Sequence, residues 1–455
     1  MALKGETVNL TIGSLWSNIW HISWPMLLIM VFNFFIGLTD VYVAGFIGPE
    51  VQAAVGFVGQ LYFFTIIIAN AISIGTLALV ARAVGAGHTE KSLGIARQSL
   101  IFSLLIAAGL TITVHVFYKE IIFLAGFPAG SREIAEKFLR IFALALGPNY
   151  VLIISSAVFR AAGDVKKPLV STFLVSIINI LGDFILVFGL FKLPKLGYTG
   201  IAWSTAGSVL IGMFINLSFF TRDRWRSFYG GPWNISLETI RKIISVGWPA
   251  ALLQVAWNAG TIVLYSILGR LGAASITAIA SITNGLRIEA VIYLPAFALN
   301  MSASVLIGQN LGAGNAERAE KVGWKIAQAG AILVTVMALA IFIWADSLAS
   351  LLTKNRDVLI ETSRYLKINM VSEPFMALGS ILGGGLQGAG DTIGTMWIVG
   401  IAMWLIRLPL SYFLAFTLNY GALGVWVAMI ISMTCQGILL ALRFHKGQWK
   451  KMVVD

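Results

Sequence analysis

The sequence predicts an all-α polytopic membrane protein with twelve transmembrane helices in two parallel six-helix lobes around a central cleft. Three observations support this fold class. Only 11% of the 455 residues are charged and 58% are hydrophobic, whereas about 25% of the residues in an ordinary soluble domain are charged. Apolar segments long enough to cross a bilayer recur along the whole chain, and matching motifs recur in its two halves.

Six apolar segments in the first half can each cross a membrane, because a spanning helix needs about 20 apolar residues. Polar or glycine-containing turns separate them and mark their ends. The predicted spans are 20–46, 53–81, 93–118, 138–162, 169–191 and 201–220.

A polar and aromatic stretch at 221–242 divides the chain, and six further apolar segments follow it. These predicted spans are 246–268, 276–307, 322–344, 366–386, 392–418 and 422–442. We therefore expect an N-terminal lobe at 1–220, a cytoplasmic linker at 221–243 and a C-terminal lobe at 244–455.

The distribution of basic residues predicts the orientation of the chain in the membrane. With the N-terminus inside, 19 of the 32 lysines and arginines fall on the inner side, 11 on the outer side, and Arg287 and Arg407 within spans. The positive-inside rule then places both termini in the cytoplasm, and we expect a cell (inner) membrane protein without a removable signal peptide. The net charge of +12 is scattered at the ends of apolar runs. This scatter argues against a nucleic-acid surface.

Four motifs recur in register in the two halves. The matched pairs are Trp24-Pro25 with Trp248-Pro249, residues 85–87 with 312–314, Ala162-Gly163-Asp164 with Ala389-Gly390-Asp391, and Gly197 and Gly200 with Gly421 and Gly424. Such self-similarity is the signature of an internal repeat. Because six is an even number, both repeats begin on the same side of the membrane and are parallel. Two parallel lobes around a cleft favour transport by alternating access.

Acidic side chains within the spans are the strongest functional candidates, because an ionised group at the bilayer centre costs about 2.5 to 3.5 kcal/mol on insertion scales. Of the 20 acids, 16 fall in loops, at termini or at span ends, which leaves Asp40, Asp183, Glu289 and Glu373. Asp40 and Asp183 lie six and eight residues before the outer ends of outward-running helices. With a rise of about 1.5 Å per residue they lie at nearly the same depth.

We expect Asp40 and Asp183 to meet in the first lobe. Asn179 lies four residues before Asp183 and shares its helix face, and Thr205 in the sixth span can reach the same pocket. Two carboxylates in a poorly solvated pocket cannot both stay ionised cheaply, so one is expected to hold a proton near neutrality. The same oxygens could instead bind sodium. The alternative is a purely structural role against helix ends or basic residues.

Two further features are weaker candidates. Glu289 has Arg287 nearby in sequence, but residues two apart on a helix face different directions. A second-lobe polar site at Glu289 and Arg287 is thus either structural or involved in ion coupling. Pro25 interrupts the first span 15 residues before Asp40, and a proline within a helix predicts a bend.

The sequence contains no pattern typical of an enzyme. Its four histidines are dispersed without metal-ligand spacing, and no G-x-x-x-x-G-K-[ST] phosphate-binding motif occurs. The one cysteine excludes a disulfide within the chain. We expect no cofactor, and energy from a gradient of protons or sodium. A membrane-embedded enzyme or a passive channel remains as an alternative of another class.

Several ordered motifs resemble one known family. They are Pro25 with residues 38–45 (LTDVYVAG), 48–50 (GPE) and 53–56 (AAVG), residues 160–164 (RAAGD), and residues 179–183 (NILGD). These motifs resemble those of the multidrug and toxic compound extrusion (MATE) transporters over essentially the whole chain. Within that family the chain is most similar to the prokaryotic DinF-like branch.

The resemblance implies a cation site formed by Asp40, Asn179, Asp183 and Thr205, and a bend in the first helix at Pro25. It also implies a monomer in the lipid bilayer that exports amphipathic, mostly cationic compounds in exchange for protons or sodium. The chain departs from related archaeal members at four substrate-cavity positions, which are Asn33, Ile36, Ile153 and Ser156. A seventh-span carboxylate used by other branches is absent from 246–268. The alternative function is a lipid-linked oligosaccharide flippase of the same superfamily, which would need a strongly basic cavity.

Overall fold

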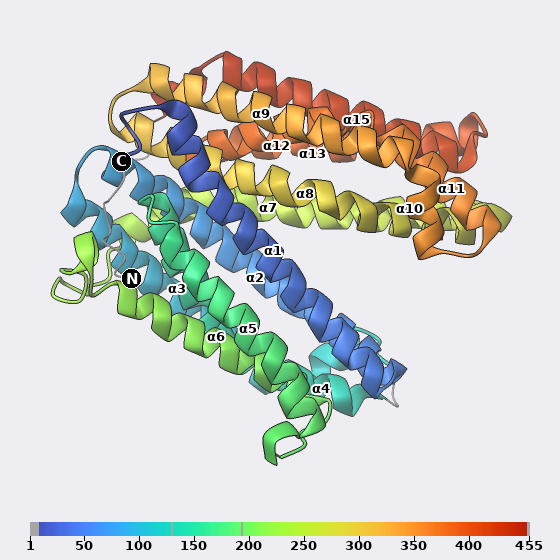
Figure 1. Ribbon diagram of the computed structural model, residues 1–455, viewed down its shortest axis with the longest axis horizontal. Coiled ribbons are helices and arrows are strands. Elements are labelled where there is room, and N and C mark those ends of the chain that lie inside the picture. Colours follow the sequence, from blue (N-terminus) through green and yellow to red (C-terminus); the bar gives the residue numbers. More distant parts are fainter. Residues whose placement is uncertain (1–8, 129–130, 193, 453–455) are drawn as a thin grey trace. The chain divides into compact units, whose positions relative to one another are not determined.

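The computed structural model of the protein describes residues 9–128, 131–192 and 194–452, and within these ranges the regular elements are helices (Figure 1). The first eight residues, to which part of the signal-peptide prediction applies, lie outside the described ranges. The chain forms two compact units. Unit 1 contains residues 24–247 with residues 9 and 10, and unit 2 contains residues 11–23 and 248–452.

Unit 1 contains α1 from Trp24 onward, the next five long helices, drawn in blue to green in Figure 1, and the start of α7. Within it, α4 packs on α2, α3 and α6, and α5 packs on α6. The helices are α1 (Leu15–Ile47), α2 (Pro49–Gly85), α3 (Thr89–Leu124), α4 (Arg132–Ala161), α5 (Lys166–Phe188) and α6 (Thr199–Phe219).

Unit 2 contains the remaining long helices, in which α8 packs on α9, α11 and α12, and α15 packs on α12. The α-helices are α7 (Leu237–Gly269), α8 (Ser275–Gly312), α9 (Ala316–Ile343), α10 (Ala345–Leu352), α11 (Arg356–Asn369), α12 (Glu373–Gly388), α13 (Thr392–Gly400), α14 (Leu408–Tyr412) and α15 (Gly421–His445). Two π-helical segments, η5 (Ile401–Arg407) and η6 (Phe413–Thr417), flank α14. The chain passes between the units within α1, before Trp24, and within α7, before Trp248.

Short 3-10 turns complete the secondary structure of the described ranges. They are η2 (Leu190–Lys192), η3 (Asp223–Trp225), η4 (Gly272–Ala274) and η7 (Gln448–Lys451).

Eleven helical segments of the described chain are long and apolar enough to cross a membrane. This confirms the predicted all-α polytopic class, and the difference from twelve arises at the predicted span 366–386. The structure divides that span into α11 and α12 at residues 370–372. Pro374 occupies the start of α12, where its missing N–H group is tolerated. Ser372 Oγ donates to the Asn369 carbonyl at 2.9 Å, which satisfies a carbonyl at the break.

The predicted repeat has the same local geometry in both halves. Gly87 and Gly314 both adopt positive φ angles, 75° and 73°, a conformation that favours glycine at a helix C-terminus. In each case the following amide, of His88 or Asn315, donates to a carbonyl five residues earlier at 2.9 Å. Gly163 and Gly390 form the second matched turn, with φ angles of 84° and 90°.

The last matched pair of glycines permits close helix packing. A Cβ atom on Gly200 would lie 2.8 Å from the backbone of Leu186, and one on Gly424 would lie 2.7 Å from the backbone of Leu414. Small residues at such positions let membrane helices approach each other closely. The structure therefore explains why glycine recurs at these two positions.

Each unit has its own apolar core, and large apolar side chains also cover outward faces. In unit 2, α9 exposes Ile332, Val336, Leu339 and Ile343. A soluble protein rarely exposes a contiguous apolar face, so this helix face is suited to lipid.

The segment predicted as a cytoplasmic linker is fixed to unit 1. Arg97 on α3 is buried and donates from Nε to the Phe228 carbonyl at 2.7 Å and from Nη2 to the Ser227 carbonyl at 3.0 Å. Trp225 Nε1 donates to Asp164 Oδ2 at 2.9 Å. Side chains of α3 and of the turn after α4 therefore hold residues 225–228. The boundaries of the lobes and the linker stay a prediction.

Candidate functional site

The four residues predicted to bind a cation lie together in unit 1. Asp40 is on α1, Asn179 and Asp183 are on α5, and Thr205 is on α6. Asn179 and Asp183 are fully buried, and Asp40 and Thr205 are half-buried. Asn179 Nδ2 donates to Thr205 Oγ1 at 3.1 Å, and the Asp40 carboxyl interacts with both Asp183 and Asn179. The structure thus brings the predicted residues together, and their role in ion binding stays a prediction.

Close packing of α5 on α6 positions these side chains. A Cβ atom on Gly182 would lie 2.5 Å from Ser204 Oγ, so glycine is required for this approach. Ser204 Oγ donates to the Asn179 carbonyl at 2.7 Å, and the same hydroxyl interacts with Asp183. Sequence reasoning missed Ser204, although its position next to Thr205 was the available signal.

Within the part of the chain that the structure describes, the carboxyl groups of the site have no basic partner. Among the described residues, none of the ion pairs includes Asp40 or Asp183. Asp40 Oδ1, both Asp183 carboxyl oxygens and Asn179 Oδ1 are buried without a donor at hydrogen-bonding geometry. Leaving buried carboxylate charge uncompensated is costly. The arrangement can therefore take up a proton shared between the carboxyls, or a sodium ion bound by their oxygens.

Pro25 lies inside α1, one residue after the point where the chain enters unit 1. It cannot donate the helical hydrogen bond to the carbonyl four residues earlier. The structure nevertheless assigns one helix from Leu15 to Ile47, and a functional bend at Pro25 stays a prediction.

The four predicted substrate-cavity positions differ in their surroundings. Ser156 on α4 is buried and accepts a hydrogen bond from Asn216 Nδ2 at 3.0 Å, so it belongs to the packing of α4 on α6. Asn33 on α1 is exposed, whereas Ile36 and Ile153 are half-buried. A substrate role for these positions stays a prediction.

The predicted second-lobe pair requires a correction. Glu289 on α8 is 1% exposed, whereas Arg287 is exposed and points elsewhere, because residues two apart lie on different helix faces. The guanidinium that acts on Glu289 is that of Arg407, and a second carboxyl, that of Glu373, lies in the same cluster. Sequence reasoning missed both partners because they lie on other helices, more than 80 residues away.

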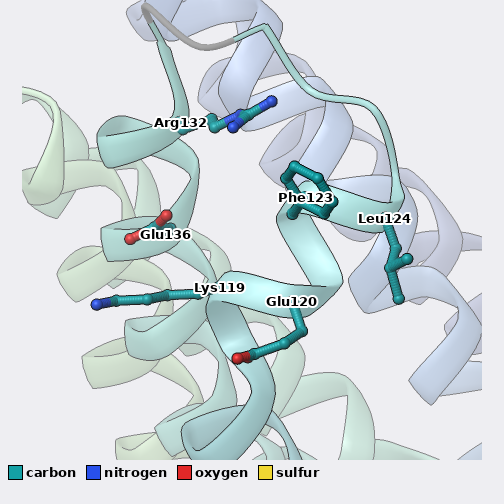
Figure 2. Close-up of a pocket in the computed structure, with 6 residues that line it drawn as sticks. All are labelled: Lys119, Glu120, Phe123, Leu124, Arg132 and Glu136. Carbon is teal, nitrogen blue, oxygen red and sulfur yellow. The ribbon is translucent and has the colours of Figure 1, made fainter.

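A separate surface pocket of about 410 Å³ lies between the end of α3 and the start of α4. Figure 2 shows its lining, which contains none of the predicted site residues. The Arg132 guanidinium lies 5.2 Å from the centre of the Phe123 ring, and Arg132 Nε donates to the Phe127 carbonyl at 3.0 Å. The lining residues are Lys119, Glu120, Phe123, Leu124, Arg132 and Glu136.

A family comparison identifies the chain. The family model described as MatE matches residues 25–185 and again residues 249–413. The chain belongs to the MatE family. Each half matches the model once, in agreement with the internal repeat. MatE proteins are membrane transporters, so this multi-span chain is a transporter and not an enzyme.

Relatives of this MatE protein align over nearly their whole length. It is 26% identical over 434 residues to "Probable multidrug resistance protein NorM" of Thermotoga maritima, covering 93% of this chain and 91% of the relative. It is 24% identical to "Uncharacterized transporter YisQ" of Bacillus subtilis, covering 95% and 94%. The prediction of the family is confirmed, and the DinF-like branch stays a prediction.

Solved structures show the same fold. A structure described as "Outward-facing conformation of a multidrug resistance MATE family transporter of the MOP superfamily" has a TM-score of 0.89 at 22% identity, covering 99% of this chain and 100% of that chain. "Crystal structure of MATE in the bent conformation" has a TM-score of 0.88 at 21% identity, covering 98% of both chains.

Proposed function

We propose that this MatE protein is a secondary active multidrug antiporter. It exports amphipathic, mostly cationic compounds across the cell membrane in exchange for protons or sodium by alternating access. The site of ion coupling is formed by Asp40, Asp183, Asn179 and Thr205, and both termini lie in the cytoplasm. The single observation that carries the proposal is the pair of carboxyls on α1 and α5 of unit 1, which have no basic partner among the described residues.

The names of the relatives support multidrug export. The relatives from Thermotoga maritima and Bradyrhizobium diazoefficiens are both described as "Probable multidrug resistance protein NorM". One solved structure of the same fold is described as "Crystal structure of MATE in complex with MaD3S". The identity of the compounds exported by this chain belongs to the proposal.

The proposed cycle depends on the charge of the carboxyl pair. In the outward-facing state the pair takes up a proton or a sodium ion, and the compound leaves. The return to the inward-facing state releases the ion into the cytoplasm. One elementary charge moving through 100 mV supplies about 2.3 kcal/mol, and each unit of pH difference supplies about 1.4 kcal/mol, so coupling to one or two ions can support accumulation of tens-fold or more.

Membrane vesicles with an imposed proton or sodium gradient test this proposal. We expect gradient-driven transport of a lipophilic cationic dye by the wild type and its loss in Asp40→Asn and in Asp183→Asn. Glu50→Gln is the control, because Glu50 is an exposed acid in the first turn of α2. Transport at the wild-type rate by both aspartate variants would contradict the proposal.

The flippase alternative is less favoured. Recognition of a lipid diphosphate requires free basic side chains in the substrate path. Of the two arginines within the predicted spans, Arg287 is exposed, and Arg407 is buried beside Glu289 and Glu373. One exposed arginine within the predicted spans falls short of the strongly basic cavity that a lipid diphosphate requires.

A further inference from the structure

The same short motif follows the last long helix of each repeat. It occupies residues 220–228 after α6 and residues 444–452 at the end of α15, an offset of 224 residues. We call these segments the unit 1 hook and the unit 2 hook. Both contain a phenylalanine, a basic residue, a tryptophan and a second basic residue in the same order. The matched positions are Phe220 with Phe444, Arg222 with Lys446, Trp225 with Trp449, and Arg226 with Lys450.

A buried tryptophan fixes the fold of each hook. Trp225 and Trp449 are both fully buried. Each packs against the ring of the first phenylalanine of its hook, at 5.6 Å in unit 1 and 4.6 Å in unit 2 between ring centres. The chain turns at the matched residues Asp223 and Gly447, whose φ angles are 55° and 69°. The basic side chains of a hook therefore start from a fixed turn and not from an irregular loop.

Each hook lies where an exposed apolar helix face ends. On α15, Ile438, Leu442 and Lys446 follow one another at a spacing of four residues and are exposed, so they share one helix face. On α6, the exposed Phe214 matches Ile438, and the exposed Arg222 matches Lys446. A basic residue at the end of an apolar face is typical of the boundary between lipid and water.

Aromatic side chains continue the apolar face of α6 beside the unit 1 hook. Tyr229, the residue directly after this hook, is 46% exposed, and its Oη donates to the Leu217 carbonyl in the last turn of α6 at 2.7 Å. Trp233 is 42% exposed, and its Nε1 donates to the Tyr229 carbonyl at 3.4 Å. Tyrosine and tryptophan are enriched at the level of phospholipid headgroups. This segment therefore has the composition of a membrane interface.

Among the described residues, two arginines of the unit 1 hook form no ion pair. They are Arg222 and Arg226, and both are exposed. The aspartate between them is already paired with Lys167 at 3.0 Å. In the unit 2 hook, by contrast, Lys450 pairs with Glu320 at 2.6 Å. The unit 1 hook thus presents two guanidiniums to an anionic partner, whereas the matched lysine of the unit 2 hook is neutralised.

We propose that the unit 1 hook binds the phosphate of an anionic phospholipid through Arg222 and Arg226. Tyr229 and Trp233 contact the apolar part of the same lipid. A guanidinium suits this partner because it donates two parallel hydrogen bonds to a phosphate. The exposed aromatic rings favour a lipid over a soluble anion, since free phosphate has no apolar part to bury. Binding in the cytoplasmic leaflet rests on the orientation in the proposed function, whereas the binding itself does not.

Photo-crosslinking of the full-length protein in lipid nanodiscs tests this proposal. The probe is a phosphatidylglycerol that carries a photoreactive group next to its headgroup, and mass spectrometry of the digested protein locates the label. We expect labelling within residues 210–233 of the wild type. The Arg222→Gln/Arg226→Gln variant should bind the probe about 30-fold more weakly, because each basic residue near an anionic surface contributes about a 5-fold attraction. The Arg222→Lys/Arg226→Lys variant keeps both charges and should retain most of the labelling.

Lys450→Gln is the matched control, because Lys450 occupies the position of Arg226 in the unit 2 hook and is already paired. It should leave the labelling of residues 210–233 unchanged. Unlabelled phosphatidylglycerol should displace the probe from the wild type, whereas phosphatidylcholine and inorganic phosphate should not.

Equal labelling of the wild type and the glutamine double variant would overturn the proposal, as would equal displacement by phosphatidylcholine or by inorganic phosphate. The displacement experiment uses the wild type, so it keeps the test open if the glutamine variant does not fold. Neither measurement requires transport, so its outcome is separate from the test of the proposed function.

Discussion

The helices α5 and α6, which carry Asn179, Asp183 and Thr205, approach each other closely at Gly200. In a Gly200→Ala variant the new Cβ atom would lie 2.8 Å from backbone atoms of Leu186 and Val187, whereas ordinary contact begins at 3.4 Å. Backbone atoms cannot rotate away, so the two helices must separate by about 0.6 Å. Overpacking of this kind costs about 1 to 3 kcal/mol.

The same separation acts on the site. The Asn179 Nδ2 to Thr205 Oγ1 distance of 3.1 Å between these helices would lengthen to about 3.7 Å, beyond hydrogen-bonding range. We therefore expect Gly200→Ala to lower both the thermal unfolding midpoint and the affinity for the coupling ion. Unfolding of purified protein, measured with and without the ion, reports both effects.

Two matched glycines provide the controls. Gly207→Ala lies on the same helix, and its Cβ atom meets nothing within 4 Å, so this variant should unfold as the wild type does. Gly424→Ala makes the equivalent clash in unit 2, at 2.7 Å from Leu414. It should lower stability and leave ion binding at Asp40 and Asp183 intact. Equal unfolding midpoints for Gly200→Ala and Gly207→Ala would show that the clash at Gly200 does not destabilise the packing of α5 on α6.

Three further predictions concern polar contacts outside the site. Arg443→Gln removes both hydrogen bonds to buried Asp391, at 2.7 and 2.8 Å. Because breaking a buried pair costs about 3 kcal/mol, the thermal unfolding midpoint of this variant should fall. An unchanged midpoint would contradict this prediction. Arg97→Ala removes the hydrogen bonds to the carbonyls of residues 227 and 228. Limited proteolysis should therefore cut within 221–242 faster than in the wild type. Equal cleavage rates would speak against a role of Arg97 in holding this segment. On α10, hydrogen bonds from Lys367 and Ser363 hold the pKa of the exposed Asp346 carboxyl below its ordinary value of 3.8. This contribution to stability is present above the ordinary value and is lost as the pH falls through the lowered pKa, so Asp346→Asn should weaken the acid dependence of the unfolding midpoint, and an unaltered dependence would rule out the contact.

The unit 1 cluster could be predicted from the sequence because helix geometry fixes the depth of each residue. Asp40 and Asp183 lie at similar distances from the ends of helices that run in the same direction, and Asn179 lies one turn from Asp183. The internal repeat could be predicted for a similar reason, since glycines recur at matched turns, where the structure gives them positive φ angles. The rise per residue of a helix was sufficient to predict the unit 1 cluster, and the recurring glycine turns were sufficient to predict the repeat.

The unit 2 cluster could not be predicted, because its members come from helices whose geometry departs from regular spans. The predicted span 366–386 is divided before Glu373, and η5 changes the helical phase before Arg407. Hydropathy detects the apolar segments 366–386 and 392–418. It detects neither the break within the first segment nor the π-helical turns within the second. Which side chains meet across helices depends on this phase, so the sequence indicated that Glu289 and Arg287 face different directions but did not identify Arg407 as the guanidinium near Glu289.

The proposed exchange of a small cation for the transported compound takes place at the carboxyl pair in unit 1. Its most direct test adds a lipophilic cationic dye to purified protein in weakly buffered solution and records the released protons or sodium ions with electrodes. We expect release of one of these ions from the wild type and none from the Asp40→Asn/Asp183→Asn double variant that still binds the dye. Equal release from both proteins would contradict it.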